Sequence, residues 1–361
     1  EHVGYVTVEP GVTFQQVRDF LLSKGSRHYL SVIGGPPEAS LIGNMADRGD
    51  SVGPMGDRFA NCTNLEVLLP NGEIVHTGFG RFQDLEISKL HKYGVGPSID
   101  GLFTQSNLGI ILKATFWLSP RPANFQLVIF GMKTDQDALG ASEEIRRLME
   151  LQVIRPNSVA IWNRYKFLTT DQQFPWDRGF ATPLTSEDLK SMKGLYPKCK
   201  WVGLIALYSP SKLHQEADQR IVKRAVRRYS TGLIAITKAK ARAIHFILAA
   251  FRAKRFIAKL DTLFEQSVFL GHPTRQSIFG LYWRKKFPPN NSIDPHSDKC
   301  GVMWICPTVP FHPTHIAKSI EIINECCLEN RLEPMIAITF PTSRCAYVLP
   351  SIVFDRDHPE E

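Results

Sequence analysis

The sequence lacks the features that mark membrane-spanning, disulfide-linked and zinc-binding proteins. Among its 361 residues, no apolar run reaches the ~18 that a membrane-spanning helix needs. Seven cysteines, an odd number without CxxC spacing, argue against a disulfide framework and a zinc site, so no metal site is expected. No signal segment is visible after Glu1, the first residue. We therefore expect a cytoplasmic protein, and a periplasmic location stays open because a leader could precede Glu1.

Acidic residues are absent from one long segment. Between Arg220 and Lys259 there are twelve Lys or Arg and no Asp or Glu, which exceeds the net charge of +8. Within it, apolar residues at helical spacing predict a basic helical insertion at about 238–265. It could be a solvated face, or it could dock on an anionic membrane surface or on a partner. It lacks the interleaved aromatic residues of a single-strand nucleic-acid site, so nucleic acid is disfavoured.

The length suggests two domains, and the first part shows clear local signals. Thr13 is an N-cap signal for a helix from Phe14 to Lys24. The glycine- and proline-rich stretch from Gly34 to Asp57 predicts a long loop. Asn71-Gly72 between two apolar runs predicts a hairpin over residues 65–77. A strand over 110–118 and the prolines of Ser119–Pro122 then predict a domain boundary.

After residue 122, strands and helices follow one another along the chain. This order predicts an α+β domain over 123–361, with a sheet flanked by helices. The expected strands are 126–130, 158–162, 201–208, 302–307, 335–340 and 347–354, and the expected helices are 135–151, 211–228 and 312–330.

Two glycine-bearing blocks in the first part could carry chemistry. The first runs from Ser40 to Gly49 and continues at Gly56–Phe59. Glycine-hinged loops let backbone N–H groups approach a pyrophosphate, and Asp47 and Asp57 could accept hydrogen bonds from a ribose or a flavin edge. An ordinary surface loop with Asx turns is the competing interpretation.

The second block runs from Tyr93 to Ile110. Its Gly94-x-Gly96 start is not a complete dinucleotide fingerprint, and no strand precedes it, so a Rossmann site is disfavoured. A polar turn leading into a strand still suits backbone contact with a cofactor. The alternative is a helix that ends in a glycine cap.

These two blocks occur in order with Val8–Val12, with the hairpin LEVLLPNGEIVHTGFG and with FWLSPRP. Together they resemble the flavin domain of the vanillyl-alcohol oxidase and p-cresol methylhydroxylase family over residues 4–122. The resemblance implies that 1–122 is the second part of a PCMH-type FAD-binding domain. It further implies that 123–361 is an α+β cap domain with an antiparallel sheet.

The resemblance implies FAD as cofactor and the oxidation or hydroxylation of para-substituted phenols by hydride transfer to the flavin. Ser40, Asn44, Asp47 and Asp57 fall on the loop that contacts FAD in the family. In the second block, the implied cofactor contacts are Asn107, Gly109 and Ile110, the last two on a turn that touches the adenine end.

The resemblance also implies a partial chain, whose cap domain is incomplete at its C-terminus. The family's pyrophosphate loop is expected before Glu1, and the Tyr–Arg pair that binds the phenolate is expected after Glu361. Catalytic residues are therefore left unassigned. The expected partners are a small aromatic substrate, a c-type cytochrome or other electron acceptor, and further copies of the chain. Two alternatives stay open: a flavin dehydrogenase of the same fold for another hydroxy substrate, and a non-catalytic fragment with a basic docking helix.

Overall fold

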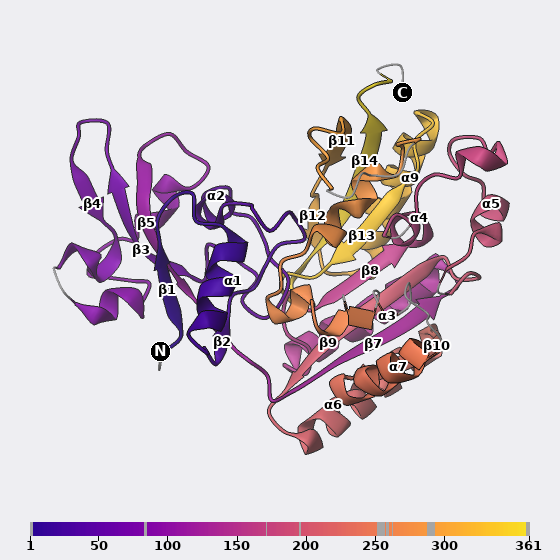
Figure 1. Ribbon diagram of the computed structural model, residues 1–361, viewed down its shortest axis with the longest axis horizontal. Helices are drawn as coiled ribbons and strands as arrows, with labels where there is room; N and C mark the ends of the chain where they lie inside the picture. Colours follow the sequence, from indigo (N-terminus) through magenta and orange to yellow (C-terminus); the bar gives the residue numbers. More distant parts are fainter. Residues whose placement is uncertain are drawn as a thin grey trace. The chain divides into compact units, whose positions relative to one another are not determined.

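The structure is a computed structural model, and it describes residues 3–82, 85–170, 172–194, 196–250, 257, 260–261, 263–286 and 293–358. The chain forms two compact units (Figure 1). The first comprises Glu1–Arg121 with Ala258–Thr274, and the second comprises Pro122–Ile257 with Arg275–Glu361. No helix in the described ranges is both long and apolar enough to cross a membrane.

The first unit is built on a four-stranded antiparallel sheet. Its strands, in spatial order, are β1 (Tyr5–Val8), β5 (Ile110–Trp117), β3 (Cys62–Leu68) and β4 (Ile74–His76). Helix α1 (Phe14–Ser23) has the expected N-cap, because Thr13 and Gln16 form a reciprocal capping box. The hairpin predicted at Asn71-Gly72 is confirmed, and Gly72 takes a φ of 87°, which a side chain would oppose.

The prediction of an uninterrupted loop from Gly34 to Asp57 was wrong. A short helix, α2 (Leu41–Ala46), lies inside it, with Ser40 as N-cap. Leu41, Ile42 and Met45 point into the core of the unit, and packing holds this helix although it is under two turns long. Its apolar residues cover only about one helical turn, which is too short a periodicity to predict a helix among the surrounding glycines.

The smaller elements of the first unit connect the sheet to these helices. Strand β2 (His28–Tyr29) pairs with β6 (Ser119–Pro120). The 3₁₀ helices η1 (Gly78–Arg81), η2 (Glu86–Lys89) and η3 (Asp100–Phe103) also lie in this part of the chain. The last of them opens the segment that leads to β5.

A later segment of the chain, Ala258–Thr274, also belongs to the first unit, although the sequence analysis placed it in the second. It contains η6 (Val268–Leu270). At Gly271, with φ of 76°, a Cβ would lie 2.5 Å from the carbonyl oxygen of Leu30, so only glycine fits. Arg18 Nε donates to His272 Nδ1 over 3.3 Å. These contacts join residues far apart in sequence, which is why local signals do not reveal them.

The second unit is an eight-stranded antiparallel sheet with helices, and the α+β class expected from the sequence is confirmed. The spatial order is β10-β7-β9-β8-β13-β14-β11, and β12 pairs with β14. The strands are β7 (Asn124–Met132), β8 (Val159–Asn163), β9 (Trp201–Ser209), β10 (Thr231–Thr237), β11 (Cys300–Trp304), β12 (Thr308–Pro310), β13 (Met335–Thr339) and β14 (Cys345–Asp355). The helical elements are α3 (Asp135–Glu150), α4 (Arg164–Leu168), η4 (Trp176–Arg178), α5 (Ser186–Ser191), α6 (Lys212–Val226), η5 (Arg227–Tyr229), α7 (Lys238–Ala250), η7 (Arg275–Tyr282) and α9 (Pro313–Glu329).

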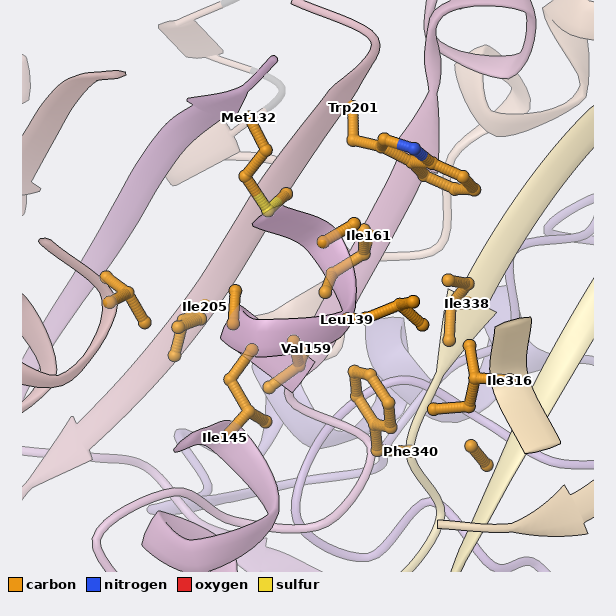
Figure 2. Packing of buried hydrophobic residues seen from close by; sticks show 14 of the residues in the cluster. Met132, Leu139, Ile145, Val159, Ile161, Trp201, Ile205, Ile316, Ile338 and Phe340 are labelled. Atoms are coloured by element: carbon orange, nitrogen blue, oxygen red, sulfur yellow. The ribbon is translucent and has the colours of Figure 1, made fainter. Parts of the chain in front are cut away.

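The main core of this unit lies between the sheet and helices α3, α6 and α9. Figure 2 shows Leu139 and Ile145 of α3 against strand residues such as Ile161, with Ile316 of α9 beside Ile338. Fully burying such a side chain contributes about 1.5–3 kcal/mol. This packing fixes the three long helices that the sequence predicted.

The basic segment contains one element that the sequence analysis missed. Strand β10 pairs with β7 at the edge of the sheet, although its sequence lies among cations. The predicted basic helix is present as α7, from Lys238 to Ala250. Of the remaining predicted insertion, 251–265, only 257, 260, 261 and 263–265 fall within the described residues.

Candidate functional site

The first candidate block is shaped by α2 and the turn that follows it. The Ser40 hydroxyl accepts a hydrogen bond from Gly43 N over 3.1 Å, so Ser40 serves as a helix cap. Asp47 ends the helix, and Arg48 then takes the left-handed φ of 51°. Gly49 N donates to the carbonyl oxygen of Asn44 over 2.7 Å. The chain therefore turns sharply and leaves the Asp47 side chain exposed.

Asn44 has an unsatisfied polar atom in this turn. Its side-chain oxygen is buried and has no hydrogen-bond partner among the residues that the structure describes. A Cβ on Gly49 would lie 1.9 Å from the Asn44 Nδ2 atom, so glycine is needed for this close approach. A buried acceptor without a partner is costly, and a ligand donor would relieve that cost.

The second candidate block is bonded directly to the end of α2. Gln105 donates its backbone N–H to Ala46 O over 2.7 Å and its side-chain amide to Asp47 O over 3.1 Å. Arg48 Nε donates to the Thr104 hydroxyl over 2.9 Å. The two blocks, which the sequence alone could only name separately, thus form one continuous surface.

The last three candidates lie where this segment enters β5. Asn107 is exposed, and Ile110 has 65% of its surface exposed. At Gly109 a Cβ would lie 2.5 Å from Val67 Cγ1, so the backbone there packs directly on β3. Leu102 and Leu108 are also exposed nearby in sequence. Polar groups and apolar side chains together suit a ligand with both polar and flat apolar parts.

Asp57 is fixed in a separate turn. Its carboxylate accepts from Ala60 N over 2.7 Å, and its carbonyl oxygen accepts from the Asn61 side chain over 2.8 Å. Among the described residues, its hydrogen bonds stay within this turn. The structure therefore bonds the second block to the end of α2, through Gln105 to Ala46 and Asp47, and it does not bond Asp57 to this junction.

Arg58, beside Asp57, is a structural residue that sequence reasoning missed. It is fully buried, and its guanidinium donates to the Ser31 carbonyl and the Ser51 hydroxyl. It lies 5.4 Å from the centre of the Phe14 ring, and burial lowers its pKa to about 10. A buried arginine with these bonds holds the 51–58 segment to the core.

Asp100 is a second residue that the sequence analysis passed over. Its buried carboxylate accepts from the Thr77 hydroxyl over 2.7 Å and from the Ser98 hydroxyl over 2.8 Å. Leu65 N donates to the same Thr77 hydroxyl over 2.9 Å. This network anchors η3, and so the start of the 100–110 segment, to β3 and the end of the hairpin.

Among the residues that the structure describes, no group of three or more His, Cys, Asp or Glu side chains could hold a metal ion. The candidate site offers backbone amides, polar side chains that include the exposed Asp47 carboxylate, and exposed aliphatic groups.

Comparison with known proteins identifies the family. The chain is 36% identical to 1'-carboxy-chondrochloren decarboxylase of Chondromyces crocatus over 364 residues, which cover 100% of this chain and 67% of that protein. The chain belongs to the family of p-cresol methylhydroxylase-type flavoprotein oxidases. The flavoprotein subunit of 4-cresol dehydrogenase (hydroxylating) of Pseudomonas putida is another member, 26% identical over 362 residues, 99% of this chain and 63% of that subunit.

The chain has the same fold as a solved structure of p-cresol methylhydroxylase with substrate bound. The TM-score is 0.82 at 23% identity, and the match covers 99% of this chain and 64% of the other. No family model matches the sequence. The chain thus spans about two thirds of the length of these relatives. FAD is the cofactor of the family, and the cofactor and family expected from the sequence are both confirmed.

Proposed function

We propose that this chain forms most of an FAD-dependent oxidoreductase that oxidises or hydroxylates para-substituted phenols. The main structural support is the bonding of Gln105 to Ala46 and Asp47, which unites the two blocks implied to contact FAD. The buried acceptor of Asn44 and the close backbone approaches at Gly49 and Gly109 fit a cofactor lying along this surface.

The chain's own residues would hold and orient the cofactor. Asp47, exposed at the end of α2, can accept a hydrogen bond from a ribose hydroxyl or from the flavin edge. The Asn44 side-chain oxygen can accept one further bond, and Ile110 offers an apolar surface to a ring. FAD, once bound, supplies the redox chemistry by accepting a hydride.

Flavin content tests the cofactor part of the proposal. In the full-length protein, Asp47→Ala and Asn107→Ala should each lower the ratio of flavin to protein absorbance without changing the far-ultraviolet circular dichroism. Asp19→Ala and Asn71→Ala are matched controls, because both residues are exposed in the same unit and lie outside the two blocks. If both test variants keep full flavin occupancy, Asp47 and Asn107 shape the turns and do not hold the cofactor.

A substrate panel tests the reaction. Under anaerobic conditions, a 4-alkylphenol should bleach the flavin absorbance, whereas a 2-hydroxy acid or a sugar should not. Bleaching by a hydroxy acid alone would favour the same-fold dehydrogenase, and a chain without bound flavin would favour the non-catalytic alternative. Comparing oxygen with cytochrome c as electron acceptor would then test the proposed cytochrome partner.

One comparison favours a second candidate function. The relative at 36% identity is named as a decarboxylase of a carboxylated compound. By analogy, this chain could act on a phenolic substrate that carries a carboxylate and release carbon dioxide. Trapping of carbon dioxide during turnover of 4-hydroxyphenyl carboxylates and of 4-alkylphenols would separate the two reactions.

A further inference from the structure

Lys166 in the second unit holds a positive charge with few protein partners. Its ammonium donates to the Ser351 hydroxyl over 3.1 Å, and among the described residues it forms no ion pair. An ammonium carries three N–H donors, and burial lowers the pKa of this one to about 8. The residue as a whole is only partly buried. A poorly hydrated lysine with unused donors is a candidate for binding an anion.

The end of β8 fixes the place of this ammonium. Helix α4 packs on β8 and β13 (Figure 1). Asn163 caps α4, and its side-chain oxygen accepts from Lys166 N and from Ile336 N, each over 3.0 Å. Its side-chain amide donates to Pro334 O over 2.5 Å. One buried amide therefore ties the helical turn that carries Lys166 to β13, so the ammonium is presented from a rigid element.

The charged groups around α4 are engaged with other residues. Glu333, just before β13, pairs with Arg284 over 3.6 Å. Asp355 of β14 pairs with Lys285 over 2.7 Å. The other titratable groups of α4 donate to backbone carbonyl oxygens: Arg164 to Met192 over 2.9 Å, and Tyr165 to Leu184 over 2.6 Å. The charge of Lys166 is therefore left for a carboxylate that these residues do not supply.

An exposed tryptophan lies beside the hydrogen-bond partner of Lys166. In the register of the sheet, Trp304 of β11 is directly opposite Ser351 of β14, so both side chains leave the sheet on the same face. Side chains paired in this way have Cβ atoms ~4.5–5.5 Å apart. Trp304 is 54% exposed, although an indole is among the largest apolar side chains. An exposed indole next to a cation suits a ligand that is both apolar and anionic.

The same face of the sheet continues in apolar side chains. Leu349 lies two residues from Ser351 along β14, and it points away from the main core because Val348 points into it. Leu349 is opposite Ala337, and Ala337 is opposite Trp162 of β8, which places Trp162 on this face too. Leu349 and Trp162 are both partly exposed. The Lys166 face, as we call it, lies wholly in the second unit and comprises Lys166, Ser351, Trp304, Leu349 and Trp162.

We propose that the Lys166 face binds a carboxylate carried by the phenolic substrate. The Lys166 ammonium and the Ser351 hydroxyl donate to the carboxylate oxygens, and Trp304 and Leu349 contact the apolar part of the same molecule. Hydrogen bonds between an ammonium and a carboxylate are about twice as strong as neutral ones. This inference rests on the second candidate function, action on a phenol that carries a carboxylate, and it makes Lys166 the residue that selects the charged substrate.

Binding of a charged and an uncharged phenol to the full-length protein tests this. The probes are 3-(4-hydroxyphenyl)propanoate and its methyl ester, titrated calorimetrically with the flavin chemically reduced so that no hydride transfer occurs. The acid should bind more tightly than the ester, and Lys166→Met should lower this preference by roughly 10–100-fold, as loss of a hydrogen bond to a charged group predicts. Lys166→Arg should keep most of the preference. Lys212→Met, at an exposed lysine of α6, is the matched control and should keep all of it.

The pH dependence of binding separates a binding role of Lys166 from a structural one. The dissociation constant of the acid, relative to that of the ester, should rise as the pH passes about 8, because Lys166 then loses its proton in the free protein. The phenol group is common to both probes, so its own titration cancels in this ratio. Lys166→Met should remove the dependence. A lysine that only supports the fold would affect both probes alike.

No binding of the acid, or equal affinity of the wild-type protein for acid and ester, would overturn the proposal. A preference for the acid that Lys166→Met leaves intact would do the same. Anaerobic bleaching of the oxidised flavin, measured separately, reports on the proposed oxidation itself. A preference for the acid without bleaching supports the Lys166 face and contradicts phenol oxidation. Bleaching by the ester without any preference supports phenol oxidation and contradicts the Lys166 face.

Discussion

Replacing Lys166 by methionine should stabilise the second unit at neutral pH. Lys166 lies on α4, and its ammonium donates to the Ser351 hydroxyl over 3.1 Å. Among the described residues, it forms no ion pair. Burial lowers its pKa from 10.5 to about 8, because the charged form loses hydration that one hydroxyl does not replace. Methionine has a similar length and carries no charge.

The size and pH dependence of the effect follow from this pKa. A fall from 10.5 to about 8 corresponds to roughly 3 kcal/mol against the charged form. Loss of the hydrogen bond to Ser351 lowers the free energy of unfolding by about 1 kcal/mol. We therefore expect Lys166→Met to raise the free energy of unfolding by a net of about 1–2 kcal/mol at pH 7. The folded pKa lies below the unfolded one, so the unfolded chain binds more protons between pH 8 and 10.5. The wild-type contribution of Lys166 to stability should therefore rise with pH across this window.

Denaturant unfolding of both proteins from pH 7 to 10 is the assay. Five of the six tryptophans lie in the second unit, so their fluorescence reports mainly on that unit. Other groups titrate in the same range; burial raises the pKa of Cys300 to about 11, for example. The difference between variant and wild type removes these contributions. The advantage of Lys166→Met should shrink above pH 8, whereas exposed Lys212→Met should show no trend. A loss of stability in Lys166→Met that is the same at every pH would refute the reasoning.

Three further predictions concern the first unit, and each is measured by the stability of that unit in hydrogen exchange. Thr13→Ala should cost about 1 kcal/mol by removing the α1 capping box, and no change would mean that the cap is dispensable. Gly271→Ala should cost more than Gly11→Ala, because both have positive φ but only Gly271 places a Cβ against backbone, at Leu30. Asp100→Asn should loosen the 100–110 segment and lower flavin content by weakening the bond from Thr77, and unchanged exchange there would contradict the anchoring role.

Local signals predicted much of the fold. Thr13 caps α1, and Asn71-Gly72 closes the hairpin, because both depend on residues a few positions apart. Strand β10 was missed because its pairing with β7 joins Thr231–Thr237 to a strand about one hundred residues earlier. Helix α2 was missed because its stability comes from burial of Leu41 and Met45, not from its length.

At the candidate site, too, the sequence predicted features that depend on nearby residues and missed those that depend on tertiary contacts. Resemblance supplied the positions that we propose contact the cofactor, and the structure shows that Gln105 of the second block is bonded to the end of α2 in the first. Arg58 and Asp100 escaped prediction because a buried charge depends on tertiary partners, here Ser31 for the first and Thr77 for the second. A charged residue in a polar loop carries no sequence signal that distinguishes burial from exposure.

The backbone at the candidate site supports the same conclusion as its hydrogen bonds. Arg48 and Gln105 are non-glycine residues with φ of 51° and 49°, and they lie on the two sides of the junction between α2 and the 101–109 segment. Each such conformation costs of order 1 kcal/mol and persists only where the surroundings enforce it. Here the enforcing bonds run from Arg48 to Thr104 and from Gln105 to Asp47, across the junction itself. These two strained residues thus lower stability while holding two loops in register where the proposed cofactor positions lie, as expected of a surface organised for binding.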